Sequence, residues 1–130
     1  MKISTLQCLV VTPAQAEVAC AGGIRWVQLR IKNASAEAWE QAARDTLLVC
    51  RRYGAVLIIN DNPALGRAVG ADGVHLGTTD LAPAAARRLL GPDFIIGGTA
   101  NTFADIEQLT AAGVNYIGLG HFALPPPSRT

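Results

Sequence analysis

The sequence predicts an α/β fold built on a parallel sheet, and three observations support this. Short apolar runs alternate with segments of helical spacing from Leu6 to Leu119, in units of about 20–25 residues. Glycine and proline separate the two kinds of segment at most junctions. Alternation of this kind implies parallel strands joined by right-handed crossovers, so either an open doubly wound sheet or part of a (β/α)8 barrel fits.

The first half of the chain contains the clearer helix signals. Thr12 is suited to cap a helix that has Pro13 at its first position, and Ser35 precedes a long helical pattern that Gly54 ends. We expect strands over 6–11, 24–29 and 55–59, and helices over 13–20 and 36–53.

The second half repeats the pattern. Asn62 and Pro63 begin a short helix, Asp80 is suited to cap the next one, and Gly97-Gly98 is expected to end the fifth strand. We expect strands over 74–76, 94–96 and 114–119, and helices over 63–69, 81–90 and 103–112, giving six strands and five helices in all.

Composition limits the functional classes. Half of the 130 residues are hydrophobic, and the net charge of +1 does not favour nucleic acid or an anionic membrane as a partner. No apolar stretch reaches the roughly 18 residues of a membrane span, so we expect a cytoplasmic protein. The three cysteines show no CxxC spacing and have apolar neighbours, which predicts core thiols.

Polar residues follow two consecutive predicted strands. Asn60 and Asp61 come directly after the third strand, and Asp80 comes shortly after the fourth. Ligands of parallel α/β folds bind beyond the carboxyl ends of the strands. Two carboxylates there suit Mg²⁺, which usually keeps several waters and bridges to phosphate.

Four motifs occur in order and together identify a resemblance. They are Gln28-Leu-Arg-Ile-Lys32, Ile58-Ile-Asn-Asp61, Gly70-Ala-Asp-Gly-Val-His-Leu-Gly77 with Asp80, and Tyr116-Ile-Gly-Leu-Gly120. The GxGxxG fingerprint is absent after the first strand, which weakens the case for a dinucleotide-binding fold. Over residues 6–122 the chain resembles thiamine-phosphate synthase, a family of (β/α)8 barrels.

The resemblance implies an activity and a set of site residues. The family joins a pyrimidine methyl diphosphate to a thiazole phosphate, uses Mg²⁺ and releases diphosphate. By resemblance, Asp61 and Asp80 would hold Mg²⁺, and Gln28 and Thr99 would face the pyrimidine, although the family usually has Ser at the latter position. The diphosphate would be held by Arg30, Lys32 and Asn60. Of these, Arg30 and Lys32 would also be catalytic residues.

Other interpretations of these residues remain open on the sequence. Arg30 and Lys32 alternate with an apolar residue and could be solvated loop charges, while Asp61 could cap the helix at Pro63. His75 lies within a strand and is expected to be a structural residue, hydrogen-bonded under the site.

Two alternative functions remain open as well. Thiazole tautomerase is a relative with the same fold that uses a histidine in a Gly-His-x-Phe segment, and this chain has His121 after Gly120. A histidine is a natural proton shuttle near neutral pH, so His121 is a catalytic candidate for that reaction. The other alternative is a non-catalytic remnant that binds a pyrimidine or a phosphate.

The length departs from the family pattern. A (β/α)8 barrel needs roughly 200 residues or more, so we expect residues 1–122 to form a barrel domain that lacks its last two βα units. Residues 123–130 are expected to be an irregular tail. If the reading frame is shifted by one base, codons that encode this tail can encode a Thr-rich segment ending in Lys. The family has such a segment at this position, so we hypothesise a frameshift. The open sheet edges predict a homo-oligomer.

Overall fold

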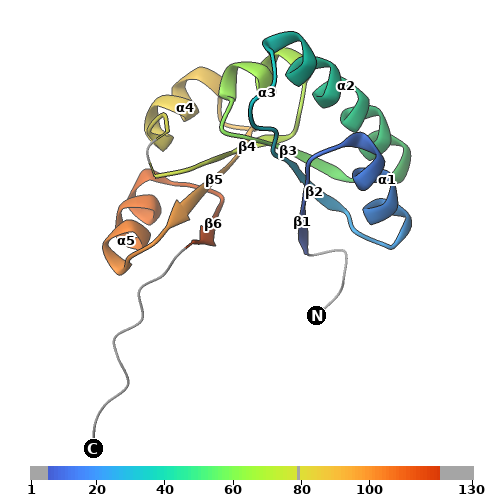
Figure 1. The fold of residues 1–130 in the computed structure, drawn as a ribbon. Coiled ribbons are helices and arrows are strands. Elements are labelled where there is room, and N and C mark those ends of the chain that lie inside the picture. Colours follow the sequence, from blue (N-terminus) through green and yellow to red (C-terminus); the bar gives the residue numbers. More distant parts are fainter. Residues whose placement is uncertain (1–5, 79, 121–130) are drawn as a thin grey trace, which may run out of the picture.

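The computed structural model describes residues 6–78 and 80–120, which form one curved sheet covered by helices on one side (Figure 1). Expectations about His121 and the tail at 123–130 lie outside the described residues. The strands are β1 (Gln7–Val10), β2 (Trp26–Leu29), β3 (Val56–Asn60), β4 (Gly73–Leu76), β5 (Ile95–Ala100) and β6 (Tyr116–Leu119). The helices are α1 (Pro13–Ala21), α2 (Ala36–Tyr53), α3 (Pro63–Val69), α4 (Pro83–Leu90) and α5 (Phe103–Ala112).

Strand order decides between the two expected architectures. The strands lie in the order β1-β2-β3-β4-β5-β6 and every neighbouring pair is parallel. A doubly wound sheet reverses its strand order and carries helices on both faces. Here the order never reverses and the helices lie on the convex face, as Figure 1 shows. The described part of the chain is therefore a partial (β/α)8 barrel.

Helix starts follow the local sequence signals in most units. The side chains of Thr12, Ser35, Asn62 and Thr102 each accept a hydrogen bond from a backbone N–H of the helix that follows. The expectation that Asp80 caps the fourth helix is wrong: α4 begins at Pro83, and Ala82 precedes it with no side-chain hydrogen bond.

The fifth strand is longer than expected. Gly97 and Gly98 continue β5 instead of ending it, and pair in register with Tyr116 and Ile117 of β6. A Cβ atom on Gly97 would overlap the Tyr116 ring, and one on Gly98 would lie 2.5 Å from Leu109 Cδ2. The two glycines therefore admit large neighbours on opposite faces of the strand, which the turn interpretation did not anticipate.

The core lies between the sheet and the helices. Strand residues that point outward, such as Leu29, Leu57, Ile59, Val74 and Leu76, are almost completely buried. The cysteine prediction is confirmed for Cys20 and Cys50, which are buried, whereas Cys8 is partly exposed.

Thr46 on α2 is completely buried, and its hydroxyl has no hydrogen-bond partner among the described residues. An unpaired buried hydroxyl costs stability, and an apolar group of the same shape removes that cost. We expect Thr46→Val to raise the free energy of unfolding by about 1 kcal/mol in urea titrations. Thr46→Ser, which keeps the hydroxyl and loses a methyl group, should lower it by about the same amount. A destabilised Thr46→Val variant would contradict this.

Candidate active site at the carboxyl ends of the strands

A cavity of about 630 Å³ opens at the carboxyl ends of the strands. Seven of the eight residues expected in the site line this cavity, and His121 lies outside the described residues. The seven are Gln28, Arg30, Lys32, Asn60, Asp61, Asp80 and Thr99. Segments far apart in the sequence thus meet at one place.

Asp61 follows β3 in an uncommon backbone conformation. Its φ of 52° lies in the left-handed region, and its N–H donates to His75 O at 2.8 Å, just beyond the β3–β4 pairing. The cap of α3 is the neighbouring Asn62, whose Oδ1 accepts from Leu65 N at 3.1 Å. The helix-cap interpretation of Asp61 is therefore wrong, and its carboxylate is available to the cavity.

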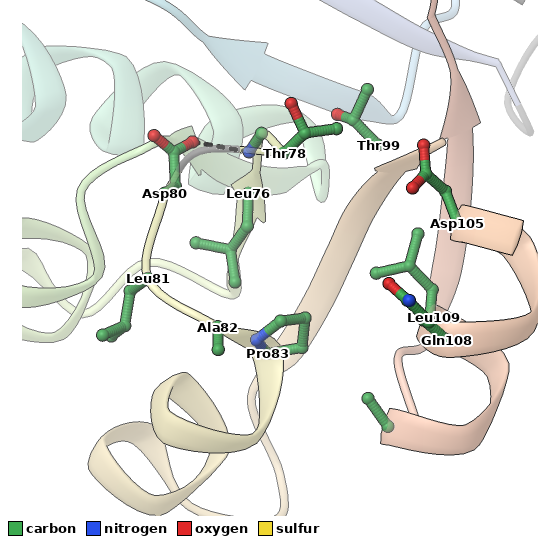
Figure 2. A pocket seen from close by; sticks show the side chains of 12 residues that line it. Leu76, Thr78, Asp80, Leu81, Ala82, Pro83, Thr99, Asp105, Gln108 and Leu109 are labelled. Carbon is green, nitrogen blue, oxygen red and sulfur yellow. Dashed lines mark hydrogen bonds between the residues drawn. The ribbon is translucent and has the colours of Figure 1, made fainter. Parts of the chain in front are cut away.

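Asp80 folds back over the end of β4. Its Oδ2 accepts from the Gly77 N–H at 2.5 Å, a bond that Figure 2 draws as a dashed line. A Cβ atom at Gly77 would lie 2.9 Å from the same oxygen, so glycine gives the carboxylate room. Asp80 and Thr99 also line a smaller neighbouring cavity of about 250 Å³, which lies between the start of α4 and one face of α5 (Figure 2).

The two carboxyl groups line the same cavity and interact electrostatically. Partial burial, a hydrogen bond with Asp80 and the negative charge of Asp80 raise the pKa of Asp61 to about 6, although much of this residue is solvent-accessible. The negative charge of Asp80 beside Asp61 favours a proton or a cation at this place. The pair therefore fits a divalent cation. Within residues 6–78 and 80–120 no group of three or more His, Cys, Asp or Glu side chains could hold a metal, so water or ligand oxygens would complete the coordination.

Arg30 and Lys32 bring positive charge to the same cavity. Arg30 is half-buried, with its backbone N–H bonded to Val10 O at 2.9 Å, and Lys32 is exposed. The ion pairs of the described residues are Arg44–Glu40, Arg51–Asp72 and Arg52–Glu17, so neither cavity cation has a carboxylate partner there. Unpaired cations beside a carboxylate pair suit a ligand that carries phosphate together with a metal ion.

The sequence prediction missed a polar network on the concave face of the sheet. Gln7 and Tyr116 were not identified as site residues, but the side chain of Gln7 contacts Gln28, and that of Tyr116 contacts both Gln7 and His75. His75 is hydrogen-bonded under the site, as expected. The available signal was the spacing: these residues occupy inward-facing positions of strands whose outward-facing positions are apolar.

Comparisons with known proteins place the chain in a family. The family model described as thiamine monophosphate synthase matches residues 7–126. The chain belongs to this family. Among curated relatives, the thiamine-phosphate synthase of Phocaeicola vulgatus is 47% identical over 107 residues, covering 82% of this chain and 51% of that protein. That of Bacteroides fragilis is 46% identical over 107 residues, covering 82% and 52%. The chain thus spans about half the length of these relatives.

Solved structures agree with the fold. The thiamine phosphate pyrophosphorylase from Pyrococcus furiosus matches with a TM-score of 0.83 and 25% identity, over 92% of this chain and 61% of that one. A citrate synthase variant matches with a TM-score of 0.69 at 11% identity, over 88% and 57%, which is a likeness of fold alone. In the described part of the chain, none of the helices has the length and apolar character that crossing a membrane requires.

The environment of His75 predicts a pH dependence. Burial lowers the pKa of His75 from its ordinary value near 6.5, while the nearby Asp80 carboxylate opposes this. The unfolded chain therefore takes up the His75 proton first, so the stabilisation from neutral His75 is complete above pH 6.5 and is lost as the pH falls below it. We expect the native chain to lose stability relative to a His75→Gln variant as the pH falls from about 7 to about 5, measured as the free energy of unfolding in urea titrations.

The raised pKa of Asp61 acts in the opposite direction, because its stabilisation is lost as the pH rises through about 6. A comparison with His75→Gln isolates the histidine contribution. A His75→Gln variant whose stability changes with pH in the same way as that of the native chain would contradict the assignment.

Proposed function

We propose that this chain carries the pyrimidine-diphosphate site of a thiamine-phosphate synthase. The reaction would condense 4-amino-2-methyl-5-hydroxymethylpyrimidine diphosphate with thiazole phosphate to give thiamine phosphate and diphosphate. The supporting observation is the single cavity that Asp61 and Asp80 share with Arg30 and Lys32. Family membership and the relatives named above agree with this transferase assignment.

The reaction requires side chains that bind the leaving diphosphate and side chains that orient the two rings, and it requires no strong base. In this proposal Arg30 and Lys32 bind the diphosphate and stabilise the charge it gains as it leaves. Asn60 binds it as well, and Gln28 and Thr99 hold the ring beside the incoming thiazole. Asp61 and Asp80 would hold Mg²⁺, which when bound supplies further neutralisation of the leaving group.

Binding of the pyrimidine diphosphate tests the proposal by calorimetry. We expect binding that requires Mg²⁺, and a loss of affinity of about tenfold or more in Arg30→Gln and in Asp61→Asn, because each removes a charge from the ligand or its metal. Arg88→Gln and Asp93→Asn are matched controls, since both residues are exposed and neither lines the cavity.

Absence of Mg²⁺-dependent binding would contradict the proposal. Turnover is measured separately, and we expect it to be weak or absent for these 130 residues. Binding without turnover would favour the non-catalytic alternative for this chain, and robust turnover would contradict the expected impairment.

For these 130 residues prepared as they stand, we propose self-association through the sheet edges. β1 and β6 each pair with one neighbour among the described strands, and the surface beside β1 exposes Leu9 and Val18, the latter to 74%. Unpaired edges with apolar neighbours favour pairing with another copy. We expect oligomers in sedimentation velocity. Val18→Glu should weaken them more than Leu48→Glu, a change of the same kind at an exposed α2 position. A monomer at high concentration would contradict this.

A further inference from the structure

A continuous hydrogen-bond network crosses the concave face beneath the cavity. Asn60 Nδ2 donates to Gln28 Oε1 at 2.8 Å, and Gln28 Nε2 donates to Gln7 Oε1. Tyr116 OH donates to the same Gln7 oxygen at 3.3 Å, which joins β6 to β1. The Tyr116 oxygen lies 2.9 Å from His75 Nδ1, and His75 Nε2 lies 2.7 Å from Thr99 Oγ1.

The network has a direction, because each hydroxyl carries a single proton. With Tyr116 donating to Gln7 Oε1, its oxygen accepts from His75, and this arrangement requires the His75 proton on Nδ1. Nε2 of the neutral ring is left as an acceptor, and Thr99 donates its own proton to it. The hydroxyl oxygen of Thr99 then has only lone pairs to offer to the cavity that it lines.

Packing holds Tyr116 in this position. Its ring lies over Gly97, where a Cβ atom would overlap it, and meets Trp26 edge-on with ring centroids 5.8 Å apart. Burial raises the pKa of Tyr116 to about 12, so its hydroxyl stays protonated at neutral pH. The residue can therefore act as a fixed link between Gln7 and His75.

We propose that Gln7 and Tyr116 are positioning residues that act through His75 to make Thr99 a hydrogen-bond acceptor toward the ligand. The site then selects a ligand with an N–H group at this point, such as the exocyclic amine of an aminopyrimidine, over an analogue with a carbonyl oxygen there. The identity of the ligand rests on the proposed function, whereas the direction of the network rests on the orientation of the Gln7 amide and on the His75 tautomer, which can be tested without a ligand.

The tautomer of His75 tests the direction without any substrate. Nitrogen NMR of the ¹⁵N-histidine-labelled chain distinguishes a protonated from a bare ring nitrogen, and His121→Gln leaves His75 as the single histidine. We expect the proton on Nδ1 and a bare Nε2. A proton on Nε2 in the native chain would overturn the proposal.

Gln7 offers a matched pair of variants. Gln7→Leu removes the acceptor, so Tyr116 is free to donate to His75 and the histidine proton should move to Nε2. Gln7→Glu keeps an acceptor and should leave the proton on Nδ1. Tyr116→Phe provides a second test, because it removes the hydroxyl that accepts from His75 Nδ1. The fraction of His75 protonated on Nδ1 should therefore fall. An unchanged tautomer in both Gln7→Leu and Tyr116→Phe would overturn the role of these residues.

Ligand preference tests the consequence. By calorimetry we expect the 4-aminopyrimidine diphosphate to bind at least about tenfold more tightly than its 4-oxo analogue. Thr99→Ser should keep this preference, whereas Thr99→Val and Gln7→Leu should abolish it. Equal binding of both pyrimidines by the native chain would overturn the inference and leave the proposed function standing. If neither pyrimidine binds, both the proposed function and the ligand assignment fail. The direction of the hydrogen-bond network is then decided by the His75 tautomer that NMR measures.

Discussion

The candidate site depends on one backbone hydrogen bond between neighbouring strands. Asp61 N–H donates to His75 O at 2.8 Å and extends the pairing of β3 with β4 by one step, while the chain turns into a left-handed conformation. This contact ties the residue that carries one carboxylate to the strand whose following loop carries Asp80. Both acidic groups line the same cavity as Arg30 and Lys32.

The concave face contributes a second constraint, because beneath the cavity it carries polar side chains that are hydrogen-bonded to one another. The residues beneath the cavity are linked to one another, from Asn60 on β3 to Thr99 on β5, by way of β1 and β6. Gly97 makes this possible by leaving space for Tyr116. Groups that would meet a ligand are thus oriented before it arrives, which reduces the cost of binding.

Sequence patterns predicted the elements well where side chains act locally. Ser35 and Gly54 mark the ends of α2 because capping involves only nearby backbone groups. The patterns failed where distant packing decides: Gly97 continues a strand because Tyr116, from the next strand, occupies the space above it. Asp80 resembles a helix cap in sequence, but its carboxylate turns to Gly77 in space.

The same distinction applies to the site. That Asp61, Asp80, Arg30 and Lys32 line one cavity could be predicted, because polar residues after buried strands converge at the end of a parallel sheet. The spacing could have placed Gln7 and Tyr116 on the inward face of the sheet, but not in contact, because they are 109 positions apart in the sequence. Curvature of the sheet creates that contact, and no local pattern specifies it.

The central claim is that the two carboxylates share one divalent cation with a bound diphosphate. Crystals grown with Mn²⁺ and inorganic diphosphate would show this directly, because anomalous scattering locates the manganese. We expect a single manganese that contacts both Asp61 and Asp80, with diphosphate oxygens between it and Arg30. Diphosphate bound without a metal at these carboxylates, or manganese bound elsewhere in the molecule, would contradict it.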